Sequence, residues 1–119
     1  MAAPNIVSVT TITGKTSGAA LTTSSADIVT NSAGSGKVFK VNAILVANVD
    51  GSANADATVG FYNADNTTTY KIASTITVPA DATLDVLSKS IYLEEGDKIT
   101  ALASASGDLE IIVSYEEIS

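Results

Sequence analysis

Short segments of strand-forming residues, separated by turns, are the feature of this sequence that most restricts its fold. Thr, Val and Ile dominate these segments, and clusters of Gly, Asn, Asp and Pro interrupt them about every ten residues. No segment combines a helical period of apolar residues with capping residues at its ends. The pattern predicts an all-β protein, an antiparallel β-sandwich of jelly-roll or immunoglobulin-like type with about eight to nine short strands.

Residues 37–49 are the clearest predicted strand. Apolar side chains recur there at every second position, which predicts one core-facing side made of Phe39, Val41, Ala43, Leu45, Ala47 and Val49. Extending the same rule to the other clear strands predicts a core that contains Phe39, Val41, Leu45, Phe61, Ile111 and Val113.

The opposite side of this strand is half apolar, because it carries Val38, Ile44 and Val46. Either a loop or the N-terminal segment covers these side chains, or they contact another subunit. Residues 5–13 are also rich in β-branched side chains and predict a strand that ends at a break over residues 14–18. The interface predicted from both segments consists of Ile6, Val7, Val9, Ile12, Val38, Ile44 and Val46. We therefore expect a homo-oligomer with closed cyclic symmetry, and a trimer in the first instance.

The chain of 119 residues is expected to form one sandwich domain over residues 18–119. Residues 1–17 are expected to form an N-terminal docking arm or first strand. No apolar run approaches the roughly 20 residues of a membrane span, and the first residues do not resemble a secretory signal. The absence of cysteine suggests synthesis in a reducing compartment.

The side chains that most enzymes depend on are missing. The sequence contains no His, Cys, Arg or Trp, so a serine nucleophile has no histidine base and structural zinc has no soft ligands. Paired carboxylates occur over residues 94–97 and 116–117, but no aromatic platform for a sugar accompanies them. We expect no enzyme activity, no catalytic residue and no cofactor.

One loop resembles the start of a calcium site. Asp50, Asn54 and Asp56 supply oxygen atoms at spaced positions, but Ala55 replaces the glycine and Phe61 stands where a bidentate glutamate is needed. A hairpin turn explains the same residues, so no metal is expected. The net charge of −7 opposes binding to nucleic acid and to anionic membranes, and neither is expected as a partner.

The order of three segments resembles a known group of proteins. These are the Ser/Thr-rich residues 21–29, the strand over residues 37–48, and Ile91-Tyr92-Leu93-Glu94-Glu95-Gly96-Asp97-Lys98-Ile99 before an acidic last strand. Together they resemble the small β-sandwich virion proteins of tailed bacteriophages, especially those of marine phages that infect cyanobacteria. The resemblance covers about four fifths of the chain.

This resemblance implies a non-enzymatic structural component of the virion, assembled in the host cytoplasm. Its partners would be the major capsid protein or other virion proteins. A capsid decoration or cement protein is the first expectation. A tail, neck or fibre component and a receptor- or glycan-binding module are the alternatives.

Overall fold

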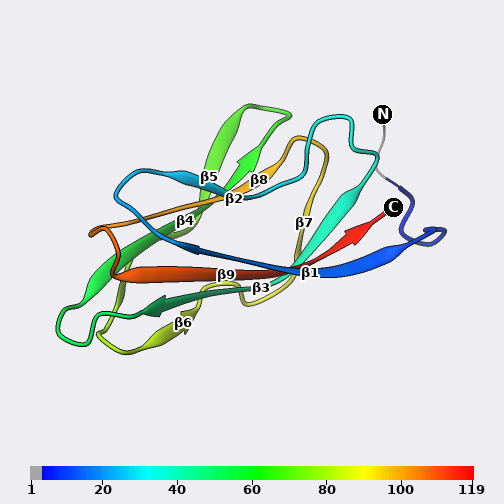
Figure 1. Cartoon of the computed structure of the whole chain (residues 1–119). Coiled ribbons are helices and arrows are strands. Elements are labelled where there is room, and N and C mark those ends of the chain that lie inside the picture. The colour runs from blue at the N-terminus through cyan, green and yellow to red at the C-terminus, as the bar shows by residue number, and fades with distance from the viewer. Residues whose placement is uncertain (1–3) are drawn as a thin grey trace.

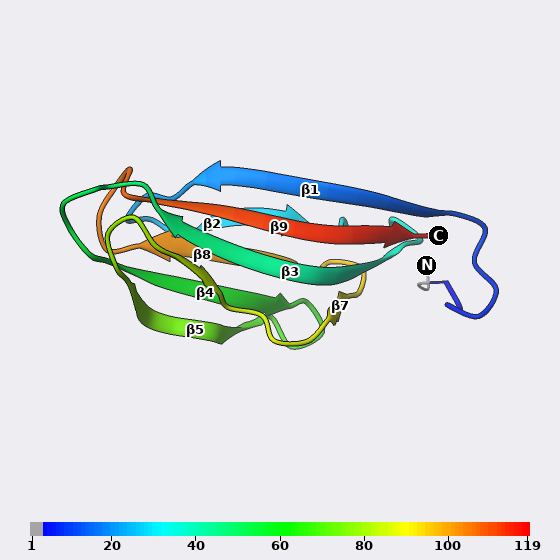
Figure 2. The same cartoon turned by 90° about the horizontal axis from the view of Figure 1, so that it is seen from below.

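The computed structural model describes residues 4–119, which form nine β-strands in two packed layers (Figures 1 and 2). The strands are β1 (Ile12–Ala20), β2 (Ala26–Thr30), β3 (Val38–Asn48), β4 (Ala55–Asn63), β5 (Thr68–Val78), β6 (Thr83–Asp85), β7 (Ile91–Leu93), β8 (Lys98–Ala103) and β9 (Leu109–Ile118). Residues 4–119 contain no helix long and apolar enough to cross a membrane.

The first sheet has the strand order β1-β9-β3-β6, and β7 also pairs with β3. The second sheet has the order β2-β8-β4-β5. All pairings are antiparallel, and the chain moves repeatedly from one sheet to the other. The predicted all-β antiparallel sandwich is therefore confirmed.

The first strand differs from its prediction. Residues 5–11 form no strand, while β1 runs from Ile12 to Ala20 and includes the predicted break at Gly14 and Gly18. Every residue of β1 pairs with β9, so the ladder extends through glycines that local propensity disfavours. Residue 17, where we placed the end of the docking arm, lies inside β1. Residues 1–3 of that arm lie outside the described part of the chain.

Strand β3 changes its inward face halfway along. Phe39 and Val41 point inward as predicted, but a register shift between Val41 and Ala43 against β9 inserts one extra residue. Beyond this β-bulge the even-numbered residues face the core, because the side-chain period of a strand is two. Ile44 and Val46 are consequently 0% exposed, whereas Leu45 is half-buried on the outer side. The prediction that Leu45 belongs to the core is wrong.

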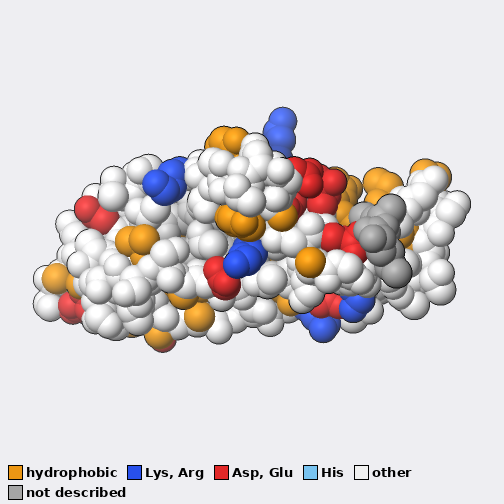
Figure 3. Space-filling view, turned by 90° about the horizontal axis from the view of Figure 1, so that it is seen from above, with side chains coloured by type: hydrophobic (Ala, Val, Ile, Leu, Met, Phe, Trp, Pro, Cys, Tyr) orange, Lys and Arg blue, Asp and Glu red, His pale blue; other side chains and the backbone are white. Residues whose placement is uncertain are grey.

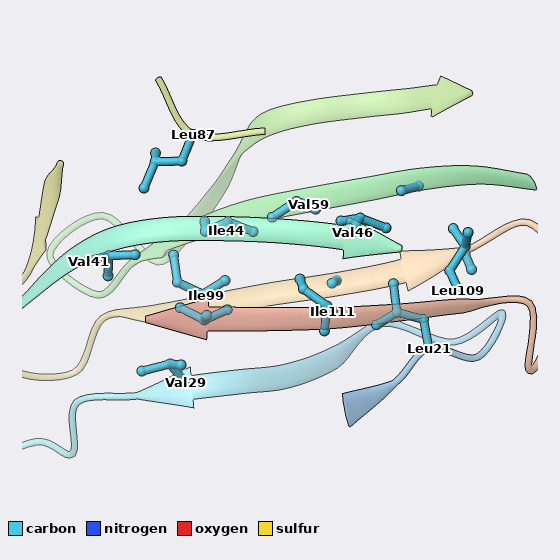
Figure 4. Packing of buried hydrophobic residues seen from close by; sticks show 14 of the residues in the cluster. Leu21, Val29, Val41, Ile44, Val46, Val59, Leu87, Ile99, Leu109 and Ile111 are labelled. Atoms are coloured by element: carbon cyan, nitrogen blue, oxygen red, sulfur yellow. The ribbon is translucent and has the colours of Figure 1, made fainter. Parts of the chain in front are cut away.

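The core is almost entirely aliphatic and lies between the two sheets (Figure 4). Regular alternation placed Ile111 and Val113 correctly, and both are fully buried. Phe61 is only half-buried but packs against the same cluster. The largest completely enclosed side chains are Leu21, Ile44, Leu93, Ile99, Leu109 and Ile111.

A buried asparagine closes one end of the sandwich. The Asn48 side chain donates hydrogen bonds from Nδ2 to the carbonyl oxygens of Ala53 and Val78, both at 2.9 Å. Its Oδ1 accepts a hydrogen bond from the Asp50 backbone N–H at 2.9 Å. One polar side chain thereby satisfies backbone groups of the loop after β3 and of the last residue of β5.

Candidate functional site

The oxygen-rich loop at residues 50–56 uses its side chains to hold turns. Asp50 Oδ1 accepts hydrogen bonds from the backbone N–H and hydroxyl of Ser52, and these bonds hold the pKa of Asp50 below its usual value. Asp56 Oδ1 accepts a hydrogen bond from the Thr77 hydroxyl at 2.8 Å. Within residues 4–119, no three side chains of the types Asp, Glu, His and Cys are grouped as metal ligands would be.

The acidic turn at residues 94–97 also has a structural role. The buried Asp97 carboxylate accepts hydrogen bonds from the backbone N–H groups of Ala64 and Glu94, both at 2.9 Å. Glu95 Oε2 accepts a hydrogen bond from the Gly36 N–H at 2.8 Å. These carboxylates tie three loops together, and none is arranged as a pair around an open cleft.

Asn31 completes this second end of the sandwich. Its Nδ2 donates to the carbonyl oxygens of Lys37 and Leu93 at 2.9 and 3.0 Å, and its Oδ1 accepts from the Ser35 hydroxyl at 2.6 Å. The sequence analysis did not identify Asn31, because an isolated Asn after a strand is indistinguishable from an ordinary turn residue. The polar side chains of these loops hold the fold together through hydrogen bonds. The remaining candidate for a functional site is therefore the surface of the sheets.

The outer face of the first sheet carries a row of apolar and small residues. Ile112 of β9 lies opposite Gly18 on β1 and opposite Leu45 on β3, so these three residues share one face. The Ile112 side chain is 44% exposed. We call Gly18, Ile112 and Leu45 the outer strip. The bulge in β3 is what turns Leu45 toward this surface.

A shallow groove of about 310 Å³ lies at the β1 end of the outer strip. It is lined by Gly18, Ala19, Ala20, Glu110, Ile111 and Ile112. The groove exists because the β1 residues beside Ile111 and Ile112 of β9 are Gly18, Ala19 and Ala20, whose side chains are small or absent. Sequence reasoning missed this groove because it treated Gly18 as part of a break and could not pair it with Ile112.

The face seen in Figure 3 lies on the opposite side of the molecule from the view of Figure 2. Its hydrophobic side chains occur in small separate groups among polar atoms and scattered charges. Lys98 of the second sheet is engaged within the chain, since its Nζ lies 3.2 Å from Asp27 and 5.1 Å from the centre of the Tyr62 ring.

The residues of the predicted interface divide into two groups. Ile6, Val7 and Ile12 are exposed, with Val7 87% exposed, and Val9 is half-buried. Ile44 and Val46 lie in the core of a single chain (Figure 4), so they have no surface left to bury against a partner. Their assignment to an interface is wrong, and the β3 bulge is the reason.

Val38, the remaining member of the predicted interface, is buried on the outer face. It lies opposite Ile118 in the β3–β9 pairing, and both side chains are buried outside the main core cluster. The N-terminal segment is fixed at this end of the sheet, because the Thr10 and Thr11 N–H groups donate to the Ser119 carbonyl oxygen at 2.7 and 3.0 Å. The structure therefore does not bring the seven predicted residues together on one surface.

A charged cluster lies beside the same end of β1. Glu117 of β9 contacts Lys15 Nζ at 3.2 Å and Lys37 Nζ at 3.0 Å. Burial raises the pKa of Glu117, but the hydrogen bonds and positive charges of Lys37 and Lys15 outweigh burial and hold the pKa below its usual value. Lys15 on β1 and Lys37 thus share one carboxylate of the same chain.

No protein-family model matches the sequence, and no curated protein matches it. The fold is shared with solved structures. A chain of the acid-stable capsid of the Helicobacter pylori bacteriophage KHP30 has a TM-score of 0.56 at 9% identity, covering 94% of this chain and 90% of that one. The Drosophila NLP core, described with pentamer formation and histone binding, has a TM-score of 0.50 at 13% identity, covering 89% and 97%. At these identities the likeness is one of fold.

Proposed function

We propose that this chain is a non-enzymatic structural protein of a tailed bacteriophage virion, most specifically a capsid decoration or cement protein. The main support for the proposal is a contrast between the interior of the sandwich and its surface. Aliphatic side chains fill the interior, while isoleucine and valine side chains are exposed on β1, β9 and the N-terminal segment. Exposed apolar side chains can bury their surface in contacts between proteins.

The fold supports the same proposal. The first sheet has the order β1-β9-β3-β6, with β7 also paired with β3, and the second has the order β2-β8-β4-β5. From these orders we infer a jelly roll, an architecture common in viral capsid proteins. The similarity to the KHP30 capsid chain extends over nearly the whole length of both chains. The similar fold of the NLP core shows that such sandwiches also serve proteins of other kinds.

The protein would stabilise the capsid through its binding energy alone, without a chemical step. Many copies would bridge neighbouring capsid subunits, and each contact would stabilise the assembled shell by mass action because it is absent from the free subunits. The N-terminal segment is the proposed docking element, with Ile6 and Val7 as its exposed apolar side chains. No charged side chain occurs in residues 4–11, so burying these residues against a partner desolvates no charged side chain.

The chain is also proposed to form a homo-oligomer with cyclic symmetry. The sequence favours a trimer as the first expectation, whereas the NLP core of similar fold is described as a pentamer. Native mass spectrometry of the purified chain distinguishes the two ring sizes from each other and from a dimer with two-fold symmetry. A monomer at every concentration would refute self-association.

Copy number in the particle tests the proposed location. Quantitative mass spectrometry of purified virions should give hundreds of copies for a decoration protein and few copies for a neck, tail or fibre component, and electron microscopy should trace the chain on the capsid exterior. Absence from the virion would refute the proposal. Specific binding on a glycan array would favour the receptor-binding alternative.

A further inference from the structure

Strand β1 is the one long, regular free edge among residues 4–119. It lies at the end of its sheet, pairs with β9 over all nine residues without a register shift, and runs along the border of the molecule (Figure 2). The other edges are short or interrupted. β6 and β7 have three residues each, β2 has a bulge, and β5 has two register shifts against β4. Proteins blunt free edges in these ways to prevent strand pairing, and β1 lacks such protection.

The side chains of β1 also permit pairing. Eight of its nine residues are exposed, and they are mostly small. Lys15 is the only charged residue, and its Nζ forms an ion pair at 3.2 Å with Glu117 of the same chain, a carboxylate that Lys37 also contacts. A lysine on an edge strand usually opposes association, and the ion pair with Glu117 weakens that effect here.

We propose that β1 pairs antiparallel with β1 of a second copy of this chain, about a two-fold axis at Thr16. This centre pairs all nine residues of both strands. It places Lys15 opposite Ser17 of the second copy and Gly14 opposite Gly18, so no like charges lie directly opposite each other, and the two Lys15 side chains are diagonal neighbours. A centre at Lys15 would instead oppose the two lysines, which is unfavourable for directly opposite residues.

The same register brings an exposed side chain to an open groove. Ile12 is 58% exposed at the start of β1, and the groove lined by Gly18, Ala20 and Ile112 lies at its end. Antiparallel pairing about Thr16 sets Ile12 opposite Ala20 of the second copy, on the outer face that both residues share with Ile112. Each copy would therefore place one isoleucine at the groove of the other. This self-complementarity identifies a second copy as the occupant.

Charge substitutions at Ser17 test the pairing. Ser17→Lys sets one lysine directly opposite Lys15 in each of the two symmetry-related pairs, and we expect the dimer dissociation constant from sedimentation equilibrium to rise about three- to thirtyfold. Ser17→Glu should lower it. Thr13→Lys is the matched control, because it adds the same charge on the same strand opposite the neutral Ala19. If Ser17→Lys and Thr13→Lys have equal effects, the register is wrong.

A single cysteine gives an independent measurement, since the chain contains none of its own. Thr16→Cys places the two thiols opposite each other, with Cβ atoms about 4.5–5.5 Å apart, so oxidised glutathione should yield a covalent dimer. Ile12→Cys is the control, because its two copies would lie roughly 26 Å apart at opposite ends of the paired strands. A strict monomer, or equal cross-linking of both variants, would overturn the proposal.

This inference concerns the free edge and does not rest on the virion role. A chain that pairs through β1 in solution but is absent from virions would refute only the proposed function. A virion component whose oligomer is insensitive to Ser17→Lys and fails to cross-link at Thr16 would refute only the pairing.

Discussion

Truncation of Ile44 to Ala should destabilise the protein far more than truncation of its neighbour Leu45. Ile44 is completely enclosed, so removing its carbons beyond Cβ forfeits about 0.8 kcal/mol for each buried methylene-sized group, or roughly 2.4 kcal/mol. The cavity left between the sheets adds to this loss, which raises the expected cost to about 3–4 kcal/mol. Leu45 is half-buried on the outer strip, and its truncation leaves no enclosed cavity, so about 1 kcal/mol is expected.

Urea denaturation followed by far-ultraviolet circular dichroism measures both free energies of unfolding. The measurements belong at low protein concentration, where contacts between copies do not protect the outer strip. The two variants should share the slope of the wild type, since neither changes the surface exposed on unfolding by much. If Leu45→Ala costs as much as Ile44→Ala, then the bulge in β3 and the inward face derived from it are wrong.

Four further outcomes are expected. Asp97→Ala should cost about 2–4 kcal/mol in urea denaturation, because it leaves two backbone N–H groups without their charged acceptor. Gly96→Ala should cost at least about 1 kcal/mol in the same assay, because Gly96 has φ +91° and an added Cβ would meet another side chain at 2.8 Å. Because Lys37 and Lys15 keep the folded-state pKa of Glu117 below its unfolded value, the stabilisation by Glu117 is complete above that unfolded value, near 4.5, and is lost as the pH falls through the folded pKa. Glu117→Gln should flatten this acid limb of the stability profile, and an unchanged limb would contradict the assignment. Treatment with EDTA should leave the melting temperature unchanged, whereas a fall that calcium reverses would return attention to Asp50.

Sequence patterns predicted the strands whose alternation is uninterrupted. Ile111 and Val113 follow a strict period of two, and the structure places both in the core. The same rule failed in β3, because a single extra residue after Val41 reverses every later side chain and leaves no mark in composition. Because the predicted alternation was displaced by one residue beyond Val41, Ile44 was predicted to lie at an interface, although it lies in the core.

The candidate site was harder to predict than the fold. Gly14 and Gly18 signal a break when read locally, yet pairing with β9 makes them part of a strand. The groove requires residues from the first and last strands together, and no local pattern pairs Gly18 with Ile112. The β-branched side chains of Ile6, Val7 and Ile12 indicated a strand or an interface, but their exposure became known only from the structure.

The position of β9 has a consequence for synthesis. This strand is the last in the chain, yet it lies between β1 and β3 in the middle of the first sheet. While the ribosome is still translating, β1 has no ladder partner and β3 presents an open edge, so the first sheet cannot close until residue 118 has emerged. Pairing that joins such distant segments is slow, and unpaired edges favour association between nascent chains. A truncation before Leu109 would therefore divide the sheet rather than shorten it, and it would leave β1 without a partner strand.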